Sequence, residues 1–245
     1  MHQHYRTKGI VLLKKDSGEA DQIFVLYTQD FGRIEVVGKA IRKITSKLKS
    51  NIDVFYFIEV EFIQGKSKKI LTDAVVIDKF LSLRKNFKKL VCVSQIAKAV
   101  SALANKEQID GNVWELLLKT FKAIENLVIE NSLEILKHYF LWNFFSLLGY
   151  SPELFVCSVC SQKLLPQTFF LSPHHGGVVC WECCNKMQKQ NQQFIFSEIS
   201  VNAVKLVRFL INQPIEMSQR LSFCGNDLHE LTRVSDAYFN FLIGG

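Results

Sequence analysis

Two pairs of cysteines constrain the fold of this chain more than any other feature. Cys157 and Cys160 form one Cys-x2-Cys pair and Cys180 and Cys183 form another, with the nineteen residues 161–179 between them. Such spacing lets both sulfurs of a tight turn point at one centre, so two turns joined by a short hairpin can place four sulfurs about 2.3 Å from one zinc ion. The pattern therefore predicts a zinc site. The alternatives are a chance occurrence of two pairs and a redox dithiol, although a thioredoxin-like site needs only one pair, at a helix start after a strand.

The predicted zinc is expected to hold structure rather than to perform chemistry. Four thiolates close the coordination sphere, whereas a hydrolytic zinc keeps an open position beside a carboxylate. The chain contains no zinc-deaminase, P-loop, dinucleotide-binding, Gly-x-Ser-x-Gly or His-Glu-x-x-His motif. The ion would instead fix residues 155–185, which have too few apolar side chains to fold alone. Cys184 is an alternative to Cys183 but lacks the two-residue spacing, and His174 and His175 are not expected to be ligands.

The first 80 residues are predicted to form five short strands. The five runs are rich in Val, Ile and Phe, their connections carry glycines, and no connection is long enough for a crossover helix. The runs are residues 7–14, 21–28, 33–37, 54–63 and 70–77. Five such strands predict a small antiparallel barrel, and in a basic chain this indicates the OB-fold, which binds oligonucleotides.

After residue 81 the apolar period becomes helical. Three helices are predicted before residue 150, the second with Asn112 and Glu115 as a capping box and the third ending at Gly149. The aromatic residues of the third helix are expected in the core rather than on a base-stacking surface. Two more helices are predicted near the C-terminus, the first capped by Ser200. The fold class is thus α+β and multidomain, with an OB-fold nucleic-acid-binding domain at 1–80, a helical domain at 81–150, a four-cysteine zinc-binding insertion (a zinc knuckle) at 151–190 and C-terminal helices at 191–245 that complete the helical domain.

The chain has a formal net charge of +7, and its cations are unevenly distributed. Residues 39–49 contain five cations and no acid, and residues 66–89 contain eight cations and two acids. A solvated surface normally mixes both signs, so the asymmetry favours a track for phosphates, with a merely solvated loop as the alternative. The first segment joins the third and fourth strands, where a barrel can contact nucleic acid. The candidate nucleic-acid-binding residues are Lys8, Arg33, Lys39, Arg42, Lys43, Lys47 and Lys49.

Neither an export signal nor a membrane span is expected. Residues 1–8 are polar with no apolar stretch after them, and the most apolar run, residues 133–148, is interrupted by charged and polar side chains. Seven cysteines without an export signal indicate the reducing cytoplasm. In that compartment, paired Cys-x2-Cys motifs bind metals more often than they form disulfides.

Several phrases of the sequence resemble the bacterial RecO family of recombination mediators. They are GIVLL at 9–13, EAD at 19–21, LYT at 26–28, FGR at 31–33, GKAIRK at 38–43, LGY at 148–150, CSVC at 157–160, FLSP at 170–173 and GGVVC at 176–180. The likeness spans the chain in order, and the glycine pair before the third cysteine is its most specific part. Three loop positions depart from the family: Ala20 replaces a serine, Ala40 replaces a glycine, and a proline is missing near Asp53.

The resemblance implies a DNA-repair protein that is not an enzyme. RecO proteins bind single- and double-stranded DNA through an N-terminal OB-fold, anneal complementary strands, engage single-strand-binding protein (SSB) and, with RecR, help to load RecA on SSB-coated DNA. The implied partners are therefore DNA, RecR and SSB, with a functional link to RecA, no membrane contact and a nucleoid-associated location. A basic rim for the acidic SSB tail is inferred from charge alone, with the candidates Arg84, Lys85, Lys88 and Lys89. The alternative is an OB-fold and zinc protein that binds RNA or acts in translation, and no pattern supports an enzyme.

Overall fold

The computed structural model describes residues 3–128, 132–165, 168–190, 194–220 and 225–244. The chain divides into two compact units, Met1–Val128 (unit 1) and Ile129–Gly245 (unit 2). The predicted α+β class is confirmed, because a five-stranded barrel, a helical part and a cluster of four cysteines are all present. In the described parts of the chain, no helix combines the length and the apolar character that a membrane crossing needs.

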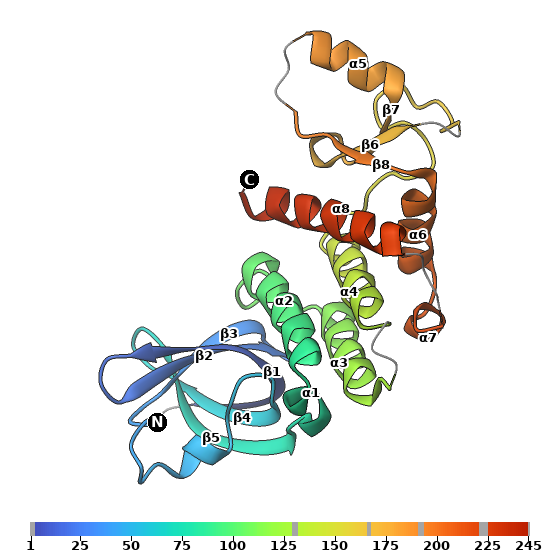
Figure 1. The fold of residues 1–245 in the computed structure, drawn as a ribbon. Helices are drawn as coiled ribbons and strands as arrows, with labels where there is room; N and C mark the ends of the chain where they lie inside the picture. Colours follow the sequence, from blue (N-terminus) through green and yellow to red (C-terminus); the bar gives the residue numbers. More distant parts are fainter. Residues whose placement is uncertain (1–2, 129–131, 166–167, 191–193, 221–224, 245) are drawn as a thin grey trace. The chain divides into compact units, whose positions relative to one another are not determined.

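Unit 1 combines the barrel with three α-helices (Figure 1). Its elements are β1 (His4–Ser17), β2 (Asp21–Thr28), β3 (Gly32–Gly38), the 3-10 helix η1 (Lys47–Ser50), β4 (Phe57–Gln64), β5 (Lys69–Asp78), α1 (Leu81–Lys85), α2 (Phe87–Leu103) and α3 (Gly111–Asn126). The five strands correspond to the five predicted runs. β1 is longer than its run at both ends, and β4 begins three residues later than predicted.

The barrel closes in the order β1-β2-β3-β5-β4. Neighbouring strands are antiparallel except β3 and β5, which are parallel and pair at Val36 with Lys69 and at Val37 with Ile70. Side chains alternate between the two faces of each strand, and the inward set is apolar. The buried interior cluster is Val11, Phe24, Leu26, Ile34, Val36, Ile41, Ile52, Ile58, Val60, Phe62, Leu71 and Ala74. The predicted barrel is therefore held by an ordinary hydrophobic core.

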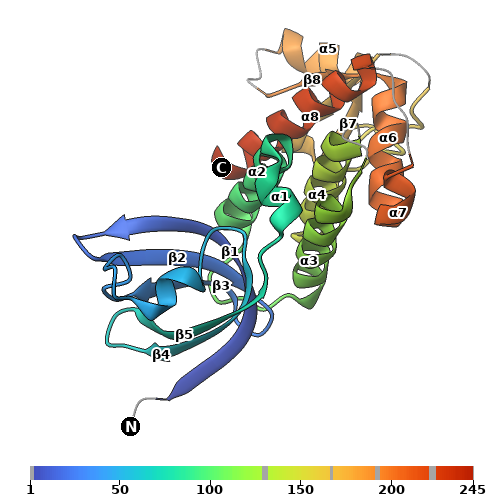
Figure 2. The ribbon, with the colours of Figure 1, turned by 60° about the horizontal axis from the view of Figure 1, so that its bottom comes forward.

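The helices of unit 1 lie against one side of the barrel (Figure 2), where α2 packs on β1 and β2. One correction concerns the start of α3. The predicted capping box at Asn112 and Glu115 is wrong, because Asp110 is the N-cap and its carboxylate accepts hydrogen bonds from the N–H groups of Asn112 and Val113. The Tyr27 hydroxyl donates to the Asp110 carbonyl at 3.4 Å and so links α3 to the barrel.

Unit 2 is built around one buried helix. Its elements are α4 (Leu133–Leu147), β6 (Phe169–Ser172), the 3-10 helix η3 (Pro173–His175), β7 (Gly177–Cys180), α5 (Trp181–Lys189), β8 (Ser197–Ile199), α6 (Val201–Asn212), α7 (Ile215–Ser218) and α8 (Gly225–Gly244). α4 packs against α6, α7 and α8. Its side chains Phe140, Trp142, Phe144 and Phe145 are fully buried, so the prediction that these aromatics form core is confirmed. The helices of the segment predicted as 81–150 are thus divided: α1 to α3 accompany the barrel, and α4 joins the C-terminal helices.

The region around the cysteines contains more regular structure than the predicted loop. β7, β6 and β8 form a three-stranded sheet, and α5 begins directly after β7. Two predicted helix signals near this region are confirmed. Gly149 has φ = 88°, the left-handed conformation expected after the end of α4, and the Ser200 hydroxyl accepts a hydrogen bond from the Ala203 N–H at the start of α6.

Candidate metal centre and candidate nucleic-acid interface

The four predicted cysteine ligands come together in unit 2. Cys157 and Cys160 lie in a turn before β6, Cys180 ends β7, and Cys183 lies in the first turn of α5. Their four sulfur atoms all lie within 4.8 Å of one another, and the Cys160 and Cys180 sulfurs are 4.0 Å apart. A zinc–sulfur distance of about 2.3 Å in a tetrahedron corresponds to sulfurs about 3.8 Å apart. The cluster can therefore hold a metal ion with small adjustments of the side chains.

Backbone hydrogen bonds place the first cysteine turn beside β7. The Ser158 N–H donates to the Val178 carbonyl at 2.9 Å, and the Ser161 N–H closes the turn on the Cys157 carbonyl at 2.8 Å. The preceding segment also pairs with this strand, because the Val178 N–H donates to the Glu153 carbonyl at 2.8 Å. The first pair of sulfurs is thus fixed to the strand that ends at Cys180, directly before the helix that carries Cys183.

The glycine pair before the third cysteine has two separate roles. Gly176 has φ = 66°, a left-handed conformation that ends η3 and that side chains disfavour. Gly177 instead permits a close approach, because a Cβ atom there would lie 2.4 Å from the Glu153 carbonyl oxygen. Both glycines therefore shape the hairpin that carries Cys180, without contacting a metal themselves.

The electrostatics of the cluster favour a bound cation. Burial raises the pKa of the Cys157 thiol, but surrounding backbone N–H groups, first those of Cys160 and Cys180, outweigh it and bring the pKa to about 7. Burial and the adjacent thiols raise the pKa of Cys183, and burial also raises that of Cys180. One thiolate thus forms readily, while its negative charge opposes ionisation of the others. A divalent cation removes this repulsion, so the donor set fits a metal such as zinc.

The remaining candidates near the cluster have other roles. Cys184 is fully buried and packs in a small core with Cys157, Val179 and Met187, while its sulfur is outside the converging set. His175 Nδ1 forms a hydrogen bond of 2.9 Å with the Ser172 hydroxyl. The His174 ring packs edge-on against Phe241, with centroids 4.5 Å apart. All three side chains are therefore accounted for by local packing.

Unit 1 carries the predicted basic segment as an ordered loop. We call residues 39–50, between β3 and the end of η1, the basic loop. The Ile41 side chain is buried in the barrel core and anchors the loop from below. From the side, the Asp21 carboxylate accepts a hydrogen bond from the Ala40 N–H at 2.8 Å and pairs with the Lys39 ammonium at 2.8 Å. The Lys39 ammonium and the Ala40 N–H also lower the pKa of Asp21, so this contact favours the charged carboxylate.

One residue of the basic loop has an unusual backbone conformation. Ala40 has φ = 52°, in the left-handed region that favours glycine. An alanine can occupy this region at a modest energetic cost when neighbouring contacts fix it. Here the Asp21 carboxylate fixes Ala40 by accepting a hydrogen bond from its N–H. Two residues later, the Arg42 N–H donates to the Ala20 carbonyl at 3.0 Å.

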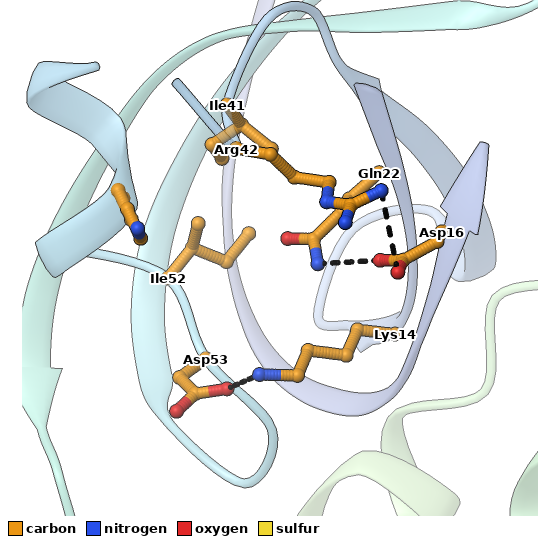
Figure 3. Close-up of a pocket in the computed structure, with 8 residues that line it drawn as sticks. Lys14, Asp16, Gln22, Ile41, Arg42, Ile52 and Asp53 are labelled. Carbon is orange, nitrogen blue, oxygen red and sulfur yellow. Dashed lines mark hydrogen bonds and ion pairs between the residues drawn. The ribbon is translucent and has the colours of Figure 1, made fainter. Parts of the chain in front are cut away.

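Two of the predicted phosphate-binding residues form ion pairs within the protein. Lys39 is paired with Asp21, and the Arg42 guanidinium lies 3.4 Å from the Asp16 carboxylate. Figure 3 shows Arg42 beside Asp16 at the wall of a pocket of about 510 Å³, which Lys14 also enters to pair with Asp53 at 2.6 Å. The residues that line it are Lys14, Asp16, Gln22, Ile41, Arg42, Lys49, Ile52 and Asp53. Positive and negative groups alternate around this pocket.

Three other lysines of the basic loop face solvent. Lys43, Lys47 and Lys49 are exposed, and none of them forms an ion pair within the described ranges of the chain. Lys8 is also exposed, on the outer face of β1, where it lies opposite Glu59 of β4. No contact of the described residues links the Lys8 side chain to the basic loop.

Arg33 lies apart from the basic loop in a second cluster of mixed charge, where Lys69 pairs with Glu107 at 2.6 Å and Lys106 pairs with Glu35 at 3.2 Å. The Arg33 side chain is only 14% exposed, and its Nε atom is buried with no hydrogen-bond partner among the described residues. It lines a pocket of about 290 Å³ between β3, the β4–β5 loop and the α2–α3 loop. The other charged residues of this pocket are Glu35, Lys68, Lys69, Lys106 and Glu107. Lys68 and Lys69 belong to the cation-rich run at 66–89, but no sequence pattern shows that Lys106 joins them.

The four candidates for the acidic SSB tail differ in how far their side chains are exposed. The Arg84 guanidinium donates to the Val54 carbonyl at 2.7 Å and pairs with Asp53 at 2.9 Å. Lys89 is buried, and its ammonium donates to the Ser82 hydroxyl and the Glu125 carbonyl. Both side chains therefore tie the helices to their surroundings. Lys85 and Lys88 are exposed, near the exposed apolar side chains Leu81 and Phe87.

Comparison with known protein families accounts for nearly every residue of the chain. Residues 1–80 match the family described as "Recombination protein O N terminal", and residues 84–245 match "Recombination protein O C terminal". Only residues 81–83 lie between the two matches, within α1 and just after the last strand of the barrel.

Curated relatives give the same result over most of their length. A protein of Dehalococcoides mccartyi named DNA repair protein RecO is 31% identical, over 98% of this chain and 90% of its own length. Proteins of the same name from Roseiflexus and from Caldanaerobacter subterraneus are 28% and 25% identical, over 98% and 95% of this chain and 81% and 90% of their own lengths. The resemblance inferred from the sequence phrases is confirmed: this chain belongs to the RecO family.

Proposed function

We propose that this protein is a recombination mediator in DNA repair, which binds single- and double-stranded DNA and catalyses no reaction itself. The observation that carries the proposal is the basic loop on an OB-type barrel, with the exposed Lys43, Lys47 and Lys49 directed to solvent. OB-folds commonly bind nucleic acids, and unpaired lysines on an ordered loop suit phosphate groups. Family membership supports the same role, since curated relatives are named DNA repair proteins.

Phosphate contacts fit the task that we propose. They supply affinity without reading base sequence, and a repair protein meets DNA of any sequence. Annealing of complementary strands is opposed by repulsion between their phosphates, which a cationic surface lowers. The net charge of +7 and the local excess of lysine in the basic loop both support this activity.

We also propose that RecR and SSB are protein partners and that the chain assists RecA loading on SSB-coated DNA. For the acidic SSB tail, the surface at Lys85 and Lys88, beside Leu81 and Phe87, is the best supported part of the candidate set. It combines cations with exposed apolar side chains, as an acidic peptide with apolar residues requires. Lys89 is unsuitable because its side chain is buried, and Arg84 is unsuitable because its guanidinium is only 31% exposed and donates to the Val54 carbonyl.

We propose that the metal is zinc, held by Cys157, Cys160, Cys180 and Cys183. Four thiolates suit zinc and leave no open position, so the ion would stabilise the surrounding fold and supply no catalytic step. This assignment is independent of DNA binding, because its donor atoms belong to unit 2 and the basic loop belongs to unit 1.

The experiment that tests DNA binding replaces Lys43, Lys47 and Lys49 together by Gln. Binding to a single-stranded oligodeoxynucleotide is measured by fluorescence anisotropy at several salt concentrations. Each lost phosphate contact reduces the slope of log affinity against log salt by about 0.7, so we expect the slope to fall by about 2. The exchanged side chains are exposed, so the fold should be retained.

A matched control removes the same number of exposed lysines from unit 2, by changing Lys163, Lys186 and Lys189 to Gln. We expect this triple variant to keep the wild-type salt slope. An unchanged slope in the basic-loop variant would refute the assignment of that loop. Competition between DNA and RNA of equal length separates the proposal from an RNA-binding function, because preference for RNA would contradict it.

A further inference from the structure

The basic loop presents one apolar side chain to solvent. Ile44 is 96% exposed, whereas Ile41 three residues earlier is buried in the barrel core. Single exposed apolar residues are common on proteins and by themselves indicate nothing. Ile44 differs because it lies in the most cationic segment of the barrel, with Lys43 immediately before it and Lys47 three residues after it.

The backbone around Ile44 forms two hydrogen-bonded turns. Consecutive turns close with hydrogen bonds of 3.1 Å from the Lys43 N–H to the Ala40 carbonyl and from the Ser46 N–H to the Lys43 carbonyl. The root of the loop is fixed by the Asp21 contacts and by buried Ile41. An apolar side chain on a fixed turn has already lost most of the conformational freedom that binding would otherwise remove.

Neighbouring charges indicate what can cover this side chain. Lys43, Lys47 and Lys49 give the surface around Ile44 a positive potential with no acid between residues 39 and 50. A partner must therefore be anionic and must also offer an apolar surface within reach of the same turn. Single-stranded nucleic acid meets both requirements, because its phosphates alternate with the flat faces of bases.

From this arrangement we propose that Ile44 is a wedge that packs against the bases of single-stranded DNA and separates two neighbouring bases. The flanking lysines hold the phosphates, and the side chain of Ile44 enters between stacked bases, as apolar wedges do in other DNA-binding proteins. The inference rests on the proposed DNA binding and adds a base contact to the phosphate contacts. A strand whose bases are held apart by a wedge is exposed for pairing with its complement.

The test compares wild type with Ile44→Ser, using a single-stranded oligodeoxynucleotide that contains 2-aminopurine, whose fluorescence rises when the base is unstacked. We expect wild type to raise the fluorescence at saturation and Ile44→Ser to abolish most of this rise. Affinity should fall about 5- to 10-fold, the order expected for burying about half of one aliphatic side chain. The salt slope should stay unchanged, since no cation is lost.

Three further variants give the test its controls. Ile44→Leu should retain the signal, because an aliphatic wedge remains. Ile109→Ser removes another exposed isoleucine of unit 1, outside the basic loop, and should behave as wild type. Lys43→Gln should lower the affinity and the salt slope while keeping the fluorescence rise at saturation. These opposite responses would separate a base contact from a phosphate contact.

Distinct results would overturn the wedge and the proposed function. If wild type binds single-stranded DNA and Ile44→Ser gives the same fluorescence at saturation, the wedge is refuted while DNA binding stands. If Ile44→Ser changes only the sedimentation of the protein, Ile44 is a protein contact and the wedge is again refuted. If wild type itself fails to bind single-stranded DNA, the proposed function fails, and the wedge with it.

Discussion

The cysteine cluster and the basic loop differ in whether their predicted residues come together at one point. All four cysteines chosen by spacing converge, with sulfurs within 4.8 Å of one another. The cations chosen by charge do not converge: Lys39 and Arg42 are bonded to Asp21 and Asp16, while Lys43, Lys47 and Lys49 point to solvent. A metal site requires its ligands to meet at one point, whereas a phosphate track requires only that cations stay accessible. Spacing therefore identifies the first kind of site, but net charge does not distinguish a cation that anchors a loop from one that can bind a ligand.

Removal of the metal ligands should produce the largest effect. We expect about one zinc per chain in wild type and none in Cys160→Ser or Cys183→Ser, with hydrogen-exchange protection lost across residues 155–189. Structural zinc contributes about 10–16 kcal/mol of apparent binding free energy in small zinc-finger peptides, so this region should not stay folded without it. Metal analysis and hydrogen exchange with mass spectrometry measure the two results.

The spare cysteine provides the control for this experiment. Cys184→Ala removes a buried thiol beside the cluster, so it should reduce stability slightly and retain the metal. Loss of metal in Cys184→Ala with retention in Cys183→Ser would reverse the ligand assignment. Wild type with no metal and four freely reactive thiols would refute the site altogether.

The next largest effect is expected on the free energy of unfolding, where a buried lysine of α2 should matter more than an exposed lysine of α1. Lys89→Ala leaves the Ser82 hydroxyl and the Glu125 carbonyl without their buried donor, so we expect the free energy of unfolding to fall by about 2 kcal/mol. Lys85→Ala removes an exposed side chain and should change it by less than about 0.5 kcal/mol. Urea titrations of the full chain measure both values.

The same pair of variants also tests the surface proposed for the SSB tail. Lys85→Ala should weaken binding of an acidic SSB-tail peptide without changing stability. Normal peptide binding by Lys85→Ala, measured by anisotropy, would remove Lys85 from that surface. Equal loss of stability in both variants would contradict the distinction between the two lysines.

The smallest effect on stability should come from the buried histidine of unit 2, which resists protonation. His138 is fully buried; burial, aided by the adjacent Lys137, holds its pKa well below 6.5. Its other polar neighbours are Glu134, at 3.9 Å, and the Thr232 hydroxyl of α8, at 3.1 Å. The unfolded chain takes up a proton near pH 6.5 and the folded chain does not. The stability of unit 2 should therefore fall as the pH drops below about 6.5, by at most about 1.4 kcal/mol per pH unit.

Comparison of thermal unfolding at pH 7.5 and pH 5.5 measures this dependence. His138→Gln should be less stable than wild type at pH 7.5 and should lose less stability on acidification. His229→Gln, which changes an exposed histidine of α8, should keep the wild-type dependence. An equal response in His138→Gln and wild type would show that other groups govern the acid sensitivity.

The sequence predicted those features that depend on residues close to one another along the chain. Strand alternation gave the five strands of the barrel, and helical periodicity placed the buried aromatics of α4. The cysteine spacing gave the cluster because each pair is confined to one turn. The glycine expected after α4 was confirmed because a left-handed residue ends many helices.

The features that the sequence did not reveal depend on contacts between distant segments. Asp21 binds the Ala40 backbone across nineteen positions of the chain, and Lys69 pairs with Glu107 across a longer separation. Neither pair follows from local periodicity. For the same reason, charge alone suggested Lys89 for a peptide surface, although the α1–α2–α3 packing buries it.

Neighbouring strands of the barrel pair over very different lengths. β1 and β4 pair along seven residues, from His4 opposite Ile63 to Ile10 opposite Phe57, whereas β3 and β5 pair only at the two positions described above. Local opening of a folded protein begins where the fewest backbone hydrogen bonds must break, so the β3–β5 seam should exchange its amide hydrogens first. The basic loop starts one residue after β3. Local opening of the β3–β5 pairing would leave the basic loop in place, because the Asp21 carboxylate and the Ala20 carbonyl hold the N–H groups of Ala40 and Arg42.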